Sequence, residues 1–155
     1  MKCGGNNMPP SNIPLKIRLT LRQGSVYYFQ HRDLTSSLPH YFVVINPDPL
    51  SDKLLVLGVF SSQIETTKQR RRNLPQKTLV EISPSEFSEL SKNSIVDCNS
   101  PKTILLEQLV EKISYKDAKD SFLRLPEELS KKILKGMLTS PLVEERIKKL
   151  LRKEE

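Results

Sequence analysis

Residues 40–63 have the sequence HYFVVINPDPLSDKLLVLGVFSSQ. They contain two runs of strand length, 40–46 and 54–63, separated by a segment rich in Pro, Asp and Ser that favours a turn. The first run is apolar on both alternating faces, so we expect both faces to be covered in the folded protein. Gly58 lies inside the second run and indicates a bulge or a bend of a barrel. The segment therefore predicts two buried strands of a small β-barrel.

Shorter segments on either side extend this β pattern. Residues 15–22 alternate apolar and basic side chains, which predicts either a half-buried strand or a short amphipathic lead-in. The polar segment 65–76 predicts a long hairpin loop with basic residues at its tip, and Ser83 with Glu86 predicts the start of a short helix. The other strand-like runs are 26–30, 78–82, 94–98 and 102–106.

The C-terminal third changes to helical spacing. Apolar residues recur every three or four positions after Pro126, which predicts helices near 126–139 and 142–152. Leu109, Val110 and Ile113 are expected to be buried along a continuation of the last strand. Seven short strands followed by helices favour a mainly β fold with α additions.

The same pattern divides the chain into three parts. We expect a flexible lead-in over 1–14, a barrel domain with a C-terminal helix over 15–140, and an extra helix over 141–155.

Length and composition are those of one ordinary globular domain, with 155 residues, 37% hydrophobic and 28% charged. No apolar run approaches the roughly 20 residues that cross a membrane, and the N-terminal residues lack the apolar core of a secretory signal. The two cysteines, Cys3 and Cys98, are expected to be free thiols in a reducing compartment. We therefore expect a cytoplasmic protein without a membrane partner.

The net charge of +7 favours a polyanionic partner such as nucleic acid. Lysines near the C-terminus alternate with glutamates, which is typical of a solvated surface. The run from Lys68 to Arg72 has four cations in five positions and is the better candidate for phosphate contacts, although a solvated loop is the alternative. No cluster of His, Cys, Asp or Glu has metal-ligand spacing, so no metal and no cofactor are expected.

Taken in order, these segments resemble the PemK/MazF toxin family over about residues 22–140. The resemblance implies an SH3-like barrel, also shared by CcdB-type gyrase poisons, that forms a homodimer. A small barrel covers only one face of the apolar strand 41–45, and we expect the dimer to cover the other. It implies the toxin of a type II toxin-antitoxin system, a metal-independent endoribonuclease that cleaves single-stranded RNA by attack of the 2′-OH. Its partners would be RNA, a cognate antitoxin protein, and operator DNA bound only as the toxin-antitoxin complex. The matching segments are 24–29, 40–46, 59–64, 74–82, 94–104 and 125–140.

The resemblance also implies a set of catalytic positions. His40-Tyr41 stands where the family has an Arg-Pro pair, and histidine can act as acid or base near neutral pH. Ser61 matches a Thr or Ser that contacts the reacting phosphate. Asp97 and Asn99 fall where some members have an Arg and an Asp, so the arginine is lost and the acid has become an amide. Asp97 could orient His40 or be a strand-edge acid.

His31 lies in the loop that overhangs the active site in this family, and a two-histidine scheme with His40 is conceivable; a solvated loop residue is the alternative. Tyr27, Tyr28 and Tyr41 could stack on bases or belong to the core. The positions expected to bind nucleic acid are Ser62, Gln63, Lys68, Arg70, Arg71 and Arg72.

Two alternatives to an active nuclease follow from the same residues. The changes at His40 and Asn99 favour a degenerate member that binds nucleic acid or a protein without cutting. A gyrase-directed poison would place its function in the C-terminal residues, which give it no specific support.

Overall fold

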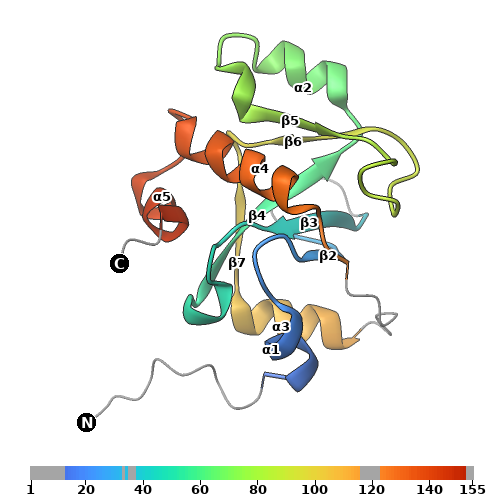
Figure 1. Ribbon diagram of the computed structural model, residues 1–155, viewed down its shortest axis with the longest axis vertical. Coiled ribbons are helices and arrows are strands. Elements are labelled where there is room, and N and C mark those ends of the chain that lie inside the picture. The colour runs from blue at the N-terminus through green and yellow to red at the C-terminus, as the bar shows by residue number, and fades with distance from the viewer. Residues whose placement is uncertain (1–12, 33, 35–37, 116–122, 153–155) are drawn as a thin grey trace.

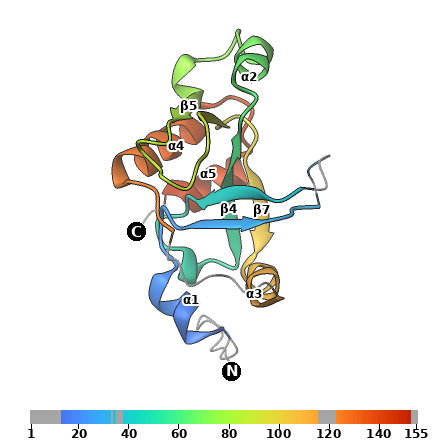
Figure 2. The same ribbon diagram turned by 90° about the vertical axis from the view of Figure 1, so that its right-hand side faces the viewer.

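The structure is a computed structural model that describes residues 13–32, 34, 38–115 and 123–152 (Figures 1 and 2). The lead-in expected over 1–14 and Cys3 lie outside the described residues, apart from Ile13 and Pro14. The strands are β2 (Val26–Phe29), β3 (His40–Val44), β4 (Leu54–Ser61), β5 (Leu79–Ile82), β6 (Ser94–Asp97) and β7 (Lys102–Leu105). The helices are α1 (Leu15–Thr20), α2 (Ile64–Arg70), α3 (Leu106–Tyr115), α4 (Glu127–Thr139) and α5 (Glu145–Arg152), with 3₁₀ turns η1 (Pro49–Ser51) and η2 (Gln76–Thr78).

Strand β4 is the centre of an antiparallel sheet with the order β2-β3-β4-β6-β5. One edge of β4 pairs with β3. The other edge is shared, because Leu54–Leu57 pair with β7 and Phe60–Ser61 pair with β6. The chain between β6 and β7 therefore interrupts this edge at residues 98–101, and in Figure 1 the two strands run in different directions. The structure is thus a mixed α/β fold around a bent antiparallel sheet.

Asn46 closes the connection between β3 and β4. Its side chain is fully buried, and its Nδ2 donates to the Asp52 carboxylate at 2.9 Å and to the Leu54 carbonyl at 3.1 Å. Its Oδ1 accepts the backbone N–H of Val56 at 2.6 Å. One amide side chain satisfies backbone groups that the turn would leave unpaired in the interior, so the two central strands keep a fixed register.

Each face of the sheet is covered by helices (Figure 2). On one face, Val43 and Ile45 belong to a core that includes residues of α4 and α5. On the other, Phe42 and Val44 pack in a core with residues of α1 and α3. All four side chains are completely inaccessible within a single chain. The expected burial of both strand faces is confirmed. The expectation that a second copy covers one of these faces is wrong, because helices of the same chain cover both. The homodimer itself stays a prediction that rests on the family resemblance.

Six of the seven expected strands are present, with ends within a few residues of the predicted ones. The strand interpretation of 15–22 is wrong, because the segment forms helix α1. Ile13, Ile17 and Leu21 are buried at a spacing of four residues, whereas Leu15 and Leu19 are exposed. The apolar residues that alternate along the sequence therefore divide between the two sides of a helix.

Three further expectations are wrong, two because a helix was not expected and one because an expected helix is absent from the described residues. The basic segment predicted as a hairpin loop forms helix α2, and the residues after β7 form helix α3 instead of continuing the strand. Leu106, Leu109, Val110 and Ile113 have helical spacing and pack in one core. The helix expected at Ser83 is only a turn, in which the Glu86 carboxylate accepts the Ser83 N–H at 2.9 Å. The helices expected near 126–139 and 142–152 are confirmed as α4 and α5.

In the described part of the chain, no helix is long and apolar enough to span a lipid bilayer.

Gly136 allows α4 to approach the sheet closely. A Cβ atom at this position would lie 2.7 Å from the Cys98 Sγ and 2.7 Å from the Lys77 carbonyl oxygen. Glycine to alanine normally stabilises a helix interior by about 1 kcal/mol. Here we expect Gly136→Ala to lower the free energy of unfolding by about 1–3 kcal/mol, because the added methyl overpacks the contact. Chemical denaturation measures the change.

Lys135→Ala, an exposed neighbour on α4, is the matched control and should change stability by less than about 0.5 kcal/mol. A Gly136→Ala protein as stable as the parent would contradict the close approach.

Candidate functional site

His40 begins β3 at the end of the sheet. Its Nδ1 lies 3.0 Å from the carbonyl oxygen of Leu38. Because a carbonyl only accepts, Nδ1 carries the proton, and the neutral ring has its basic lone pair on Nε2. The ring packs 6.5 Å from the Phe42 ring, between centroids, on the face that α1 and α3 cover further along. His40 is therefore a partly exposed histidine held in a defined tautomer.

Ser61 lies at the matching end of β4. The β3–β4 pairing ends at Phe42 and Val59, and two residues beyond it on each strand, residue alternation turns the His40 and Ser61 side chains toward the same face. The Ser61 Oγ accepts the backbone N–H of Gln63 at 3.1 Å, which turns the chain into α2. Ser62 and Gln63 are exposed at this turn. The histidine and hydroxyl positions expected from the sequence thus share one end of one sheet face.

Asp97 does not orient His40. It lies on β6, and β4 separates it from β3. Its Oδ2 accepts the Arg71 Nε at 2.8 Å, and the Arg71 Nη2 donates to the Ser100 hydroxyl at 2.6 Å. The two side chains are mostly buried, with 17% of Arg71 and 14% of Asp97 exposed. This ion pair attaches the end of α2 to the interrupted sheet edge.

Asn99 extends the same network into the interior and is only 4% exposed. Its Nδ2 donates to Asp97 and to the Thr78 hydroxyl, both at 2.9 Å, and its Oδ1 accepts the Ser140 hydroxyl at 2.6 Å. Asn99 therefore links β6, η2 and the end of α4, and no face of it is open to a large substrate. The neighbouring Cys98 is also buried, and burial raises the pKa of its thiol to about 12, so it is protonated at neutral pH.

Three of the four cations of the basic segment lie within 4 Å of acidic side chains of the same chain. Lys68 pairs with Glu81 at 2.7 Å, and Arg70 lies 3.9 Å from the Asp97 carboxylate that binds Arg71. Arg72 donates to the Gln69 carbonyl at 2.9 Å and is exposed. The run of four cations in the sequence suggested that a polyanion is needed to offset their repulsion. The contacts within the protein show that it is not needed. Lys68, Arg70 and Arg72 keep substantial exposure, and Arg71 does not.

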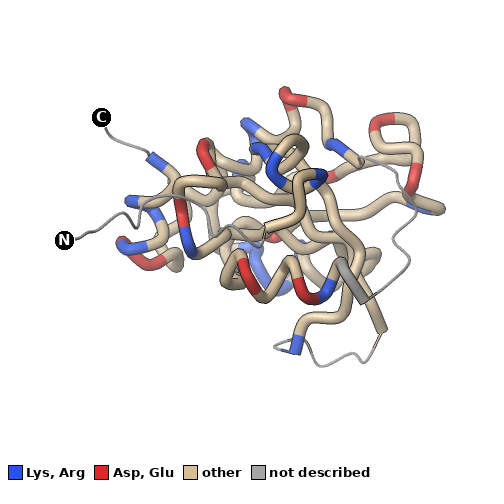
Figure 3. The backbone as a smooth tube through the Cα atoms, turned by 90° about the horizontal axis from the view of Figure 1, so that it is seen from below, with Lys and Arg blue, Asp and Glu red and all other residues tan. Residues whose placement is uncertain are grey.

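Charge elsewhere does not single out one face. Figure 3 shows Lys and Arg on most elements with Asp and Glu interspersed.

His31 is 5% exposed, so it is not the solvated loop residue of the alternative reading. Its Nε2 lies 2.9 Å from the Thr103 carbonyl oxygen and therefore donates to it. Its ring lies 5.7 Å from the Phe42 ring. The two histidines thus contact the same buried phenylalanine, one inside the protein and one at its surface.

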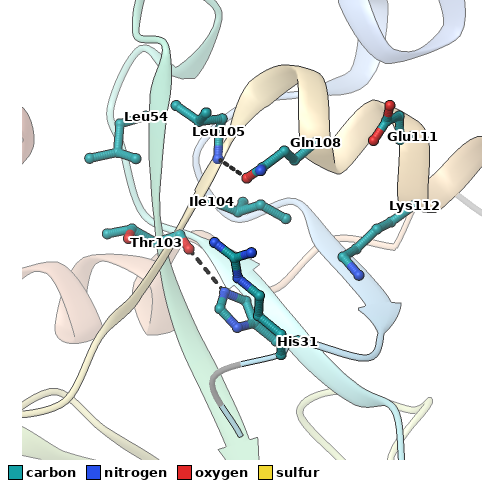
Figure 4. Close-up of a pocket in the computed structure, with 9 residues that line it drawn as sticks. His31, Leu54, Thr103, Ile104, Leu105, Gln108, Glu111 and Lys112 are labelled. Atoms are coloured by element: carbon teal, nitrogen blue, oxygen red, sulfur yellow. Dashed lines mark hydrogen bonds between the residues drawn. The ribbon is translucent and has the colours of Figure 1, made fainter.

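A pocket of about 580 Å³ opens beside His31, between β7, α3 and the start of the β2–β3 loop (Figure 4). Leu54, Ile104 and Leu105 form its apolar part. Its polar groups are His31, Arg32, Thr103, Gln108, Glu111 and Lys112. No pattern in the sequence indicated this pocket, because its residues come from three separated stretches of the chain, 31–32, 54 and 103–112.

The tyrosines divide between surface and core. Tyr28 is 52% exposed and its ring lies 4.6 Å from that of Tyr41. Tyr41 also meets Phe87 edge to face, and burial together with the nearby Glu89 raises its pKa. Tyr27 is more deeply buried, and desolvation raises its pKa to about 12. Of the three, Tyr28 has the most open ring for stacking.

Within the described residues, no group of three or more His, Cys, Asp or Glu side chains could hold a metal ion. A comparison with models of known protein families finds no match, and neither does a comparison with curated proteins.

Arg71 is expected to act on stability. Arg71→Ala leaves Asp97 mostly buried without its ion-pair partner, and we expect the free energy of unfolding to fall by about 2 kcal/mol. Thermal or denaturant unfolding measures the loss. The double variant Arg71→Ala/Asp97→Asn should lose less stability than the sum of the losses in the two single variants, because the buried carboxylate that needs the cation is gone.

Arg72→Ala is the control, since Arg72 is exposed and bonded only to a carbonyl of its own turn among the described residues. Its stability should stay within about 0.5 kcal/mol of the parent. Equal losses in Arg71→Ala and Arg72→Ala would rule out a structural role for the Arg71–Asp97 pair.

Proposed function

We propose that this protein is a PemK/MazF-like toxin, an endoribonuclease that cleaves single-stranded RNA at the end of the sheet face where His40 and Ser61 lie. The observation that carries the proposal is the state of His40. Its Nδ1–H is bound to a backbone carbonyl, so Nε2 can accept a proton at the protein surface. A histidine in this state meets the first requirement of metal-independent RNA cleavage, a positioned general base.

The chemistry assigned to this site is internal transesterification. Nε2 of His40 takes the proton from the ribose 2′-OH, and the 2′-oxygen attacks the adjacent phosphorus. The bond from phosphorus to the 5′-oxygen breaks, and that oxygen takes a proton from solvent or from a protonated side chain. The products are a 2′,3′-cyclic phosphate and a 5′-hydroxyl. The Ser61 hydroxyl is proposed to contact the phosphate.

Arg70 is proposed to bind the RNA backbone beside this site. It projects from α2, which begins three residues after Ser61, and its side chain is 54% exposed. By alternation along β4 and β6, Ser61 and Asp97 lie on one face, so the Arg70 beside Asp97 belongs to that face as well. Because β4 lies between Asp97 and β3, this guanidinium would bind a phosphate next to the one that reacts at His40.

The partners of the proposal come from the family resemblance. They are a cognate antitoxin that holds the nuclease in check, operator DNA bound by the complex, and a second copy of the chain. We further propose that the bent sheet is an SH3-like barrel, an assignment supported by its β4 strand, which pairs with three others.

A binder that does not cut RNA is the second candidate. The observation that favours it is the network around Asn99, which takes up Asp97, Arg71 and Asn99 in structural contacts. In that case the same surface would hold RNA or a protein, and His40 would only pack at the strand end.

His40→Ala should lower the rate of RNA cleavage by about 10²–10⁴, because it removes the general base. The parent protein should cleave single-stranded RNA in EDTA and leave 2′,3′-cyclic phosphate ends. Single-turnover cleavage of a labelled RNA pool, with end-group analysis of the fragments, measures both.

Gln30→Ala is the control, because Gln30 is exposed and directly follows β2, the strand that pairs with β3; this variant should keep the parental rate. Cleavage that is unchanged in His40→Ala would remove the site assignment but leave the enzyme. RNA that is bound but never cut, across many sequences and pH values, would leave only the second candidate.

A further inference from the structure

The pocket beside His31 has the composition of a site for a flat ring that carries a phosphate. Its volume of about 580 Å³ falls in the range of small-molecule sites. Ile104 and Leu105 give it an apolar wall, and Arg32 and Lys112 line it with two cations against the single carboxylate of Glu111. We propose that this pocket holds one nucleotide of the RNA strand, with its phosphate on Arg32 and Lys112. The inference rests on the proposed function.

The polar groups of the pocket favour a ligand over an added β-strand. The pocket lies along the edge of β7 that does not pair with β4. On that edge, the Thr103 carbonyl accepts from His31, and the Leu105 N–H donates to the Gln108 side chain at 3.3 Å (Figure 4). Side chains of the protein thus already bind two backbone groups that an incoming strand would need.

Lys112 is placed to bind an anion without rearrangement. It projects from α3 toward the pocket, and its Nζ lies 6.0 Å above the centre of the Phe29 ring (Figure 4). In the described residues it forms no ion pair within 4 Å, and the one carboxylate that lines the pocket is on the exposed Glu111. Its charge is therefore available to a phosphate, which contributes affinity that depends on salt.

The pocket and His40 lie on two sides of one residue. The Phe42 ring lies 5.7 Å from His31, which lines the pocket, and 6.5 Å from His40. A nucleotide in the pocket and a scissile phosphate at His40 can therefore belong to the same RNA strand. The pocket would then set which nucleotide is accepted, and His40 would act on a neighbouring linkage.

The test compares Lys112→Met with Lys132→Met, an exposed lysine on α4. Methionine keeps the aliphatic stem and removes the charge. Binding of a short single-stranded RNA is measured by fluorescence anisotropy over a range of salt. Lys112→Met should weaken binding roughly tenfold at low salt, and the slope of log K against log salt should fall by about 0.7. Lys132→Met should match the parent in every measurement.

A second measurement tests the pocket directly. Methyl NMR signals of Leu54, Ile104 and Leu105 should shift with a nucleoside 5′-monophosphate, and less with the matching nucleoside. Equal salt slopes for Lys112→Met and Lys132→Met, or methyl signals that do not move, would overturn the proposal. If His40→Ala loses cleavage but Lys112→Met binds RNA like the parent, the nucleotide pocket is rejected and the proposed nuclease stands. If the protein binds the free nucleotide but never binds RNA, the pocket is a site for free nucleotides, and the proposal that it holds part of an RNA strand is rejected.

Discussion

The pairing of β4 on both of its edges is the constraint on which the rest of the structure depends. One edge carries β3, and the other is divided between β7 and β6. Because β4 is buried on both faces, its backbone groups must all find partners within the sheet. The division of one edge obliges the chain at 98–101 to leave the sheet and return. The helices cover the two faces, and their positions follow from the sheet side chains on which they pack.

This interruption explains why several expected catalytic residues are structural. Asp97 and Asn99 are polar groups at the point where the sheet edge opens, and Arg71, Thr78 and Ser140 satisfy them. Buried polar groups of this kind stabilise only when every member is paired. The network holds α2, η2 and α4 on one edge, so α2 can present the more exposed Arg70 beside the strand ends. The proposed nuclease therefore depends on this network for position and on His40 for chemistry.

The sequence predicts the sheet better than the site. Buried runs such as 40–46 and 54–63 indicate strands by length and composition alone, and their burial on both faces follows from the same pattern. Helix α1 is missed because short alternating segments also satisfy helical spacing. Helix α2 is missed because a run of like charges favours a solvated loop in the sequence alone, whereas in the structure acidic side chains pair with three of the cations. The role of Arg71 depends on Asp97, 26 residues away, and the pocket depends on three separated stretches of the chain. Neither can be deduced from local periodicity, since tertiary packing decides them.

The chain contains only two histidines, so their ring NMR signals test the central claim directly. His40 lies at the proposed cleavage site, and His31 is buried against the pocket with its Nε2–H on a carbonyl. The protein is titrated with a single-stranded RNA in which hydrogen replaces the 2′-hydroxyl at the cleaved position. This RNA cannot be cleaved, because it lacks the attacking group. The account predicts that the His40 ring signals shift in proportion to the RNA bound. RNA that binds, as judged by anisotropy on the same sample, while the His40 signals stay unchanged would contradict it.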